Sequence, residues 1–221
     1  MLETKTIESA TTADGTEFVL AQRGSEWLVR VGGKMLMSSR MHDSEEELAA
    51  RALERVPQAR AVLVGGLGLG YTLRAVLDRV PADSRVMVAE LVPAIVDWNR
   101  THVSALAGSP LSDTRVEVEV GDVLHAVRRE EQAFDCILLD VDNGPVGLSQ
   151  ASNQRLYGPR GVSACLKALR PGGVLAVWSA GPSERFEKQL ASVGFQVEVV
   201  RVLARKGSRG QHVLFLGQRR R

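Results

Sequence analysis

The stretch from Ala61 to Glu90 constrains the fold of this chain most. It reads AVLVGGLGLGYTLRAVLDRVPADSRVMVAE: an apolar run, a glycine-dense turn, a helical stretch, and a second apolar run that ends in a carboxylate. Gly66, Gly68 and Gly70 have no Cβ, so they let the backbone turn sharply and bring a ligand against main-chain N–H groups. The helix that follows directs the positive end of its dipole there. Glu90 lies where a carboxylate can accept both ribose hydroxyls. The stretch therefore predicts a nucleoside-binding pocket.

Composition bounds the class of protein. A chain of 221 residues can form one well-cored domain with a small appendage. A hydrophobic content of 44% and a net charge of +2 are ordinary for a globular protein and give no ground for a nucleic-acid partner. No apolar run reaches the ~20 residues of a membrane span, and the N-terminus lacks the basic-then-apolar order of a signal peptide. We expect a cytoplasmic enzyme without a membrane partner.

The first part of the chain predicts a small antiparallel sheet. Residues 1–15 are polar, which indicates a loosely held segment. Three short β-like runs follow, at residues 17–22, 27–31 and 34–37. Gly32-Gly33 between the last two is typical of a tight hairpin. Ser44 then has the features of a helix N-cap, and Pro57 ends that helix. We predict an N-terminal β-hairpin region over 1–43 and an α/β domain over 44–221.

From residue 61 the pattern alternates between strand and helix. Strands are predicted at 61–64, 85–89, 115–120, 134–139 and 174–178. Helices are predicted at 70–79, 93–106, 123–130, 155–169 and 183–193. Near-continuous apolar strands are typical of a sheet covered on both faces, and the alternation predicts parallel strands with right-handed crossovers. Two final runs, 195–203 and 212–216, have no helix between them. They complete a Rossmann-like, seven-stranded, mostly parallel sheet with an antiparallel C-terminal hairpin.

Four features separate this chain from dinucleotide-binding domains. The glycine spacing is G-x-G-x-G, and Tyr71 stands where the dinucleotide fingerprint has its third glycine. The chain closes with a β-hairpin, Gly121-Asp122 follows the third strand, and LRPGG precedes the fifth. Together these features resemble a class I S-adenosylmethionine-dependent methyltransferase fold.

Within that fold the chain resembles the spermidine synthase family. The similarity covers about residues 25 to 200 and is carried by VLVGGLGLGYTLRAVL, VMVAELVPAIVDWNR, DTRVEVEVGDVLHAV, FDCILLDVDNGPVG and LYGPRGVSACLKALRPGGVLAVWS. The segment that starts at Asp140 looks like the family's catalytic aspartate segment, and an N-terminal β-hairpin is also a family trait. The resemblance implies S-adenosylmethionine or its decarboxylated form as cofactor, and a homodimer.

The resemblance also implies roles for individual residues. Those assigned to the cofactor are Gly66, Gly68 and Gly70 at the sulfonium, Glu90 at the ribose, Leu91, Asp122 and Val123 at the adenine, and Asp140 at the reacting end. Asp140 is also the predicted catalytic residue. It follows a buried strand, at the edge where such sheets bind ligands. There its carboxylate can orient an ammonium and receive its proton.

The acceptor half departs from the family pattern. The family has aspartates where this chain has Leu69 and Asn143, and a tyrosine in the segment that reads MHDSEE here. A dicationic diamine needs several anionic partners, because unpaired buried charges cost several kcal/mol. The sequence therefore favours an acceptor other than putrescine. The candidate acceptor-site residues are Asp142, Asn143, His42 and Glu45, with His42 as a candidate general base.

Three functional hypotheses follow. The main one is methyl transfer from S-adenosylmethionine to a small amine or similar nucleophile. The alternative is aminopropyl transfer from decarboxylated S-adenosylmethionine, with Asp140 and Asp142 sharing the amine site and Glu45 or Glu46 replacing the missing anions. The third is a non-catalytic scaffold of the same fold. No residue spacing indicates a metal site, and the basic C-terminal hairpin fits a solvated edge strand better than a nucleic-acid surface.

Overall fold

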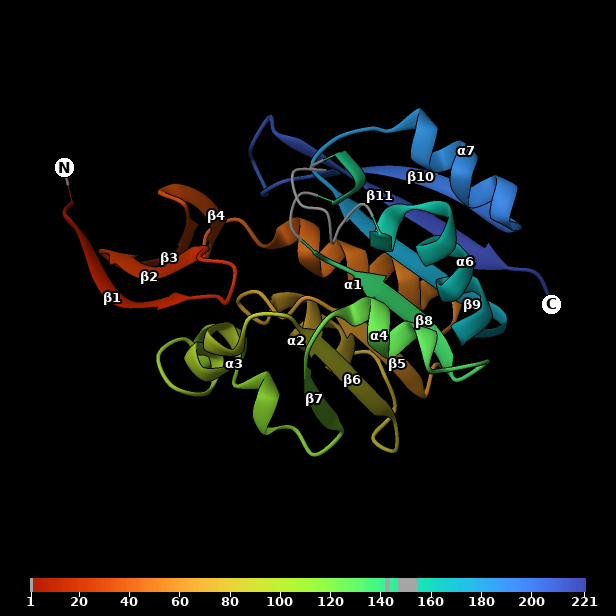
Figure 1. The fold of residues 1–221 in the computed structure, drawn as a ribbon, viewed down its shortest axis with the longest axis horizontal. Coiled ribbons are helices and arrows are strands. Elements are labelled where there is room, and N and C mark those ends of the chain that lie inside the picture. Colours follow the sequence, from red (N-terminus) through yellow and green to blue (C-terminus); the bar gives the residue numbers. More distant parts are fainter. Residues whose placement is uncertain (1, 142–143, 147–154) are drawn as a thin grey trace.

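The computed structural model describes residues 2–141, 144–146 and 155–221. The predicted acceptor residues Asp142 and Asn143 lie outside the described residues. Two sheets organise the chain (Figure 1): a small N-terminal sheet at one end of the molecule, and a larger sheet with helices on both faces. The sequence-derived fold class is confirmed.

The N-terminal sheet is antiparallel and has four strands in chain order. Its strands are β1 (Thr4–Thr11), β2 (Glu17–Arg23), β3 (Glu26–Val31) and β4 (Lys34–Ser38). The prediction that residues 1–15 are loosely held was wrong, because β1 pairs with β2 from Thr4 opposite Arg23 to Thr11 opposite Glu17. The exposed β1 side chains gave no apolar pattern by which to recognise a strand.

The larger sheet has the order β10-β11-β9-β8-β5-β6-β7. Its strands are β5 (Ala61–Gly65), β6 (Arg85–Glu90), β7 (Val116–Val120), β8 (Phe134–Leu139), β9 (Leu169–Ser179), β10 (Phe195–Leu203) and β11 (Gln211–Arg219). β11 runs antiparallel to both of its neighbours, and the pairs from β9 to β7 are parallel. The chain thus crosses from β5 outward to β7, returns to β8, and places the carboxyl ends of β5, β6 and β8 side by side.

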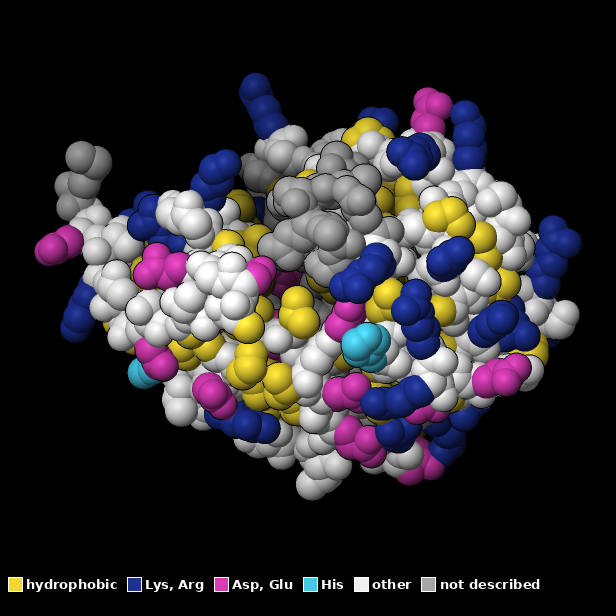
Figure 2. Space-filling view, in the orientation of Figure 1, with side chains coloured by type: hydrophobic (Ala, Val, Ile, Leu, Met, Phe, Trp, Pro, Cys, Tyr) yellow, Lys and Arg dark blue, Asp and Glu magenta, His cyan; other side chains and the backbone are white. Residues whose placement is uncertain are grey.

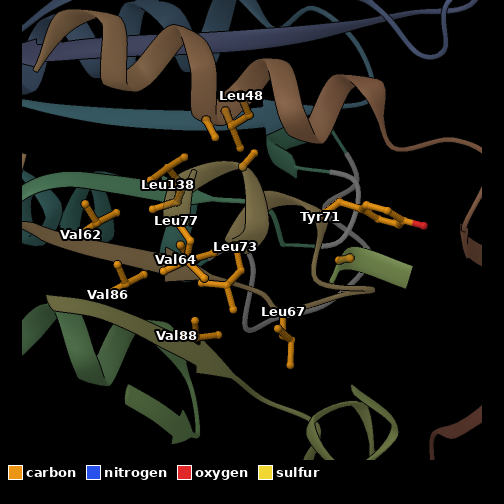
Figure 3. Close-up of a cluster of buried hydrophobic side chains, with 14 of the residues drawn as sticks. Leu48, Val62, Val64, Leu67, Tyr71, Leu73, Leu77, Val86, Val88 and Leu138 are labelled. Atoms are coloured by element: carbon orange, nitrogen blue, oxygen red, sulfur yellow. The ribbon is translucent and has the colours of Figure 1, made fainter. Parts of the chain in front are cut away.

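Helices cover both faces of this sheet (Figure 1). They are α1 (Asp43–Arg55), α2 (Tyr71–Leu77), α3 (Pro93–Arg100), α4 (Val123–Arg128), α6 (Pro159–Ala168) and α7 (Glu184–Val193). The short 3-10 turns are η1 (Ser104–Ala107), η2 (Pro110–Ser112) and η3 (Gly144–Val146). Side chains of α1, α2 and α3 share one apolar core with the sheet, and those of α4, α6 and α7 share another. In Figure 3, Leu48 of α1 packs toward Leu77 of α2 and Leu138 of β8.

Several predicted boundaries shift. The helix predicted over 93–106 ends at Arg100 because the chain tightens into η1. The helix predicted over 155–169 is interrupted at Gly158, and α6 begins at Pro159. Ser44 is not the N-cap of α1: His42 occupies that position without a side-chain cap, and Ser44 lies inside the first turn. Among the described residues, no helix has the length and apolar character to cross a membrane.

Candidate nucleoside-binding and transfer site

A pocket opens between the two sheets, at the carboxyl ends of the parallel strands. Its lining is Phe18, Leu36, Met37, Gly66, Gly68, Ala89, Glu90, Leu91, Val92, Ile95, Gly121, Asp122, Val123, Asp140, Val141 and Leu156. Six of the residues predicted to hold the cofactor therefore share one cavity with Asp140, which is the predicted catalytic residue. Figure 2 shows hydrophobic side chains exposed between the N-terminal sheet and the larger sheet on this face of the molecule.

The glycine turn has the conformation that its sequence predicts. Gly66 and Gly70 both have a φ of 88°, and Gly68 has a φ of 54°, which residues with a side chain rarely adopt. A Cβ on Gly66 would overlap the carbonyl oxygen of Asp140, and one on Gly68 would lie 3.3 Å from the Met37 sulfur. Gly66 and Gly68 line the pocket. Gly70 instead starts α2 and packs against Asn99, so its role is to build the turn.

Glu90 is held firmly at the end of β6. Its side chain is buried, its Oε2 accepts the N–H of Leu67 at 2.8 Å, and its Oε1 accepts the N–H of Val92 at 2.9 Å. One bond ties it to the glycine turn and the other to the entry of α3. Two fixed hydrogen bonds leave the carboxylate little freedom, so its position in the pocket wall is set before a ligand arrives.

The residues predicted for the adenine lie on the same side. Leu91 is 54% exposed at the pocket, whereas Val123 is buried beside it. Asp122 is the N-cap of α4, and its Oδ1 accepts the N–H of Leu124 at 2.9 Å. A capping role thus accounts for one oxygen of Asp122. The Oδ2 of Asp122 lies 3.8 Å from the Arg155 guanidinium.

Asp140 follows β8 and faces the pocket. The hydroxyl of Thr72, in the first turn of α2, donates to its Oδ2 at 2.6 Å. Burial raises the pKa of Asp140 to about 6, and the Thr72 hydrogen bond opposes this rise by favouring the charged form. Our sequence analysis missed Thr72. The available indication was a hydroxyl two residues after the last glycine of the turn, on a helix whose other buried residues are mainly apolar.

Glu45 lies in the first turn of α1. Its pKa is raised well above the usual value by burial, and next by the charges of Asp140 and Glu46. Within the described part of the chain, the Glu45 carboxyl group has no hydrogen-bond or ion-pair partner, and the Asp140 carboxyl group has no cationic one. Glu45 and Asp140 are thus two partly buried carboxyl groups whose negative charges repel each other, so a cation beside them would be stabilised.

His42 does not line the pocket. Its ring stacks on Tyr71 with the centroids 4.1 Å apart, and its Nδ1 lies 2.7 Å from the Glu46 carboxylate. The Tyr71 hydroxyl donates to the Ser39 carbonyl at 3.3 Å, and burial followed by the charge of Glu45 raises the pKa of Tyr71 to about 12. These contacts attach the link after β4 to the start of α2, which supports a structural role for His42.

The cluster of His42, Asp43 and Glu46 places possible metal-ligand atoms within 4.8 Å of one another, where the sequence analysis expected no metal. His42 and Glu46 are already bonded to each other. Asp43 accepts the backbone N–H of Lys206 at 2.5 Å. These hydrogen bonds account for the arrangement of the three side chains without an ion.

The N-terminal sheet contributes three residues to the pocket that the sequence analysis did not anticipate. Phe18, Leu36 and Met37 come from β2 and β4 and form the apolar wall opposite the glycine turn. Residues from a separate sheet carry no sequence pattern that links them to a distant pocket. Among the described lining residues, the charged side chains are all carboxylates, those of Glu90, Asp122 and Asp140.

Comparison with known structures identifies the fold. The chain superposes on the spermidine synthase from Thermotoga maritima with a TM-score of 0.79, covering 97% of this chain and 72% of that one at 19% identity. A spermidine synthase in complex with the transition-state analogue AdoDATO matches equally well. The fold is thus that of spermidine synthases.

The family follows from the sequence. The spermine/spermidine synthase domain matches residues 41–201, so the chain belongs to this family. The polyamine aminopropyltransferase of Mycobacterium tuberculosis is 28% identical over 173 residues, which are 75% of this chain and 31% of that protein. The enzyme of Nitrosomonas europaea is 34% identical over 126 residues, covering 57% of this chain and 37% of that one. The chain therefore spans about a third of the length of these relatives.

Proposed function

We propose that this chain transfers an aminopropyl group from decarboxylated S-adenosylmethionine to an amine. The curated relatives are named polyamine aminopropyltransferases, which supports our alternative hypothesis and gives no support to methyl transfer. The observation that carries the proposal is the charge of the site. The charged side chains of its described lining are all carboxylates, and the partly buried carboxyl groups of Asp140 and Glu45 have no cationic partner among the described residues.

This charge favours the decarboxylated cofactor. S-adenosylmethionine carries a carboxylate, which needs a cation or several N–H donors when it leaves water. The decarboxylated form lacks that carboxylate and carries an aminopropyl chain on its sulfur. Its sulfonium and its ammonium are therefore two positive charges with no negative charge to balance them. In a pocket whose described charged residues are Glu90, Asp122 and Asp140, the cationic molecule is the better match.

The residues then have distinct roles. Glu90 receives the ribose hydroxyls, Leu91 and Val123 flank the adenine, and Asp122 accepts from its amino group. Gly66 and Gly68 allow the sulfonium to approach the backbone. Gly70 acts through the shape of the turn. Asp140 and Glu45 bind the amine, and we assign Asp140 the proton because Thr72 orients it toward the pocket.

The transfer needs mainly positioning. The neutral amine nitrogen attacks the carbon of the propyl chain bonded to sulfur, a C–N bond forms, and the C–S electron pair returns to sulfur to give the thioether methylthioadenosine. The proton lost by the nitrogen passes to Asp140. With its pKa raised to about 6, Asp140 is ionised at neutral pH and is a stronger base than an ordinary aspartate.

The acceptor is expected to be an amine bound chiefly through Glu45 and Asp140. Leu69, which replaces a family aspartate, is buried in the apolar core and offers no charge to the acceptor. Glu45 is not among the lining residues of the pocket, but its charge interacts with that of Asp140, so it can supply a carboxyl group from α1. This difference predicts an amine preference unlike that of enzymes that retain the aspartate.

Product analysis tests the proposal. The purified chain is incubated with each form of the cofactor and a panel of mono-, di- and polyamines, and the nucleoside product is identified by mass spectrometry. Methylthioadenosine that forms in an amine-dependent manner is the expected product. S-adenosylhomocysteine would show methyl transfer instead and refute the proposal. If neither forms although the nucleoside binds, and Asp140→Asn leaves the protein's biological activity intact, the chain is a scaffold.

A further inference from the structure

A hydrogen-bonded cluster joins three elements beside the acceptor side of the pocket. The indole Nε1–H of Trp178, at the end of β9, donates to the Ser44 hydroxyl at 3.1 Å. The same hydroxyl lies 2.9 Å from Nδ1 of His212 in β11. The Trp178 and His212 rings also meet edge to face, with centroids 4.5 Å apart. Ser44 is 2% exposed, so water cannot replace these bonds.

The chemistry of the three groups fixes their roles. An indole N–H only donates, so Ser44 accepts from Trp178 and keeps its own hydrogen for His212. All three groups are satisfied when Nδ1 of His212 is unprotonated and accepts that hydrogen. Burial lowers the pKa of His212, which agrees with a neutral ring at physiological pH. The chain of bonds therefore runs in one direction, from Trp178 to Ser44 to His212.

The cluster connects the elements that carry the two carboxyl groups. Leu139 pairs with Val177, so the next residues, Asp140 and Trp178, leave adjacent strands at the same edge of the sheet. Ser44 is the neighbour of Glu45 in the first turn of α1. One end of the cluster is thus attached to the strand beside Asp140, and its centre is attached to the helical turn that carries Glu45.

We infer that Trp178, Ser44 and His212 are positioning residues that hold Glu45 at a fixed separation from Asp140, and so set the affinity for the acceptor amine. This inference rests on the proposed function. The charges of the two carboxyl groups repel each other. His42 and Asp43 fix the start of α1 through Tyr71 and Lys206, whereas the bonds of Ser44 tie the residue next to Glu45 to β9 and β11. Without the cluster, we expect the repulsion to move Glu45 away from Asp140. The amine then loses its second carboxylate, whereas the nucleoside end of the pocket is unaffected.

Matched variants separate this role from simple packing. Ser44→Ala removes both bonds, and His212→Leu removes one. His212→Asn retains an acceptor where Nδ1 lies. We expect Ser44→Ala and His212→Leu to raise KM for the amine about fivefold or more, the loss of about one hydrogen bond, with nucleoside Kd within about twofold of the wild type. His212→Asn should restore most of the loss. His102→Leu, which removes an exposed histidine bonded to Glu8, is the control.

A second measurement does not depend on turnover. The Glu45 carboxyl is titrated by 13C NMR in the wild type and in Ser44→Ala, with Glu45→Gln used to assign the signal. A lower pKa for Glu45 in Ser44→Ala is expected, because the carboxyl groups move apart. An unchanged pKa, or equal losses in amine KM and nucleoside Kd, would overturn the inference. Failure of every amine to react while the Glu45 pKa still shifts would reject the proposed function but leave the cluster's positioning role intact.

Discussion

The hydrogen bond from Thr72 to Asp140 allows a quantitative test of the proposed base. Thr72→Val keeps the shape of this buried side chain and removes the hydroxyl that donates to Oδ2 at 2.6 Å. A hydrogen bond to a charged group stabilises it by about 1.5–3 kcal/mol. We take the lower end because Asp140 faces the pocket and water can partly replace the donor. About 1.4 kcal/mol corresponds to one pKa unit, so the pKa of Asp140 should rise from about 6 to about 7.

The direction of the effect on rate follows from this change. At pH 6 the ionised fraction of Asp140 falls from about one half to about one tenth, so the variant should be about fivefold slower than the wild type, relative to their ratio at high pH. The deficit approaches tenfold at lower pH. The acceptor amine also loses protons as pH rises, but that contribution is the same for both proteins and cancels in the ratio.

The assay is the pH dependence of kcat/KM for the amine, which reports the free enzyme. Thr72→Ser is the matched control, because it keeps the hydroxyl and loses only a methyl group. The ratio of Thr72→Val to wild type should be flat above about pH 8 and fall below it. A ratio that is independent of pH from 5 to 9 would refute the assignment of Asp140 as the base and of Thr72 as the group that tunes it.

Three further predictions concern the same pocket. Glu90→Gln places an NH2 group against a backbone N–H donor, so nucleoside affinity should fall at least about tenfold by calorimetry, and unchanged affinity would remove the basis of the assignment. Gly66→Ala adds a side chain at a φ of 88°, where it overlaps the Asp140 carbonyl, so the melting temperature should fall and nucleoside binding should be lost. Gly181→Ala, with open space around its Cβ, should change neither. Asp140→Asn should abolish turnover yet stabilise the ligand-free protein at neutral pH. The pKa of Asp140 is higher in the folded state (about 6) than in the unfolded state (3.8), so its stabilising contribution is present below that window and is lost as pH rises through it. A gain of about 1 kcal/mol would raise the melting temperature by about 2–4 °C, and a decrease measured by calorimetry at pH 7.5 would contradict this sign.

The nucleoside half of the pocket could be predicted because local sequence builds it. The glycine turn requires positive φ, and Glu90 follows its strand directly, so Gly66 and Glu90 are recognisable from spacing alone. The strand order could be predicted for a similar reason: apolar runs that alternate with helices have few ways to pair. These parts of the fold depend on residues close together in the chain.

The acceptor half depends on contacts between distant residues. Serine is a typical N-cap residue, and sequence alone cannot reveal that the Ser44 hydroxyl bonds instead to a histidine 168 residues away. His212 belongs to no sequence motif, so its contact with Ser44 could not be predicted either. Met37 reaches the pocket from a separate sheet. The preference for methyl transfer came from Leu69 and Asn143, that is, from missing family residues. The alternative, aminopropyl transfer, included Glu45 as a replacement anion, and the structure places electrostatic interaction between Glu45 and Asp140.

Because both sheets line the pocket, ligand binding also affects the stability of their association. Phe18, Leu36 and Met37 come from the N-terminal sheet, and Glu90 and Asp140 lie at the carboxyl ends of strands of the larger one, so a nucleoside that filled the pocket would contact both sheets. By linkage, a ligand that binds only the assembled arrangement strengthens that assembly by the free energy of its own binding. A ligand that fills the pocket should therefore protect the connection around Ser39 from proteolytic cleavage.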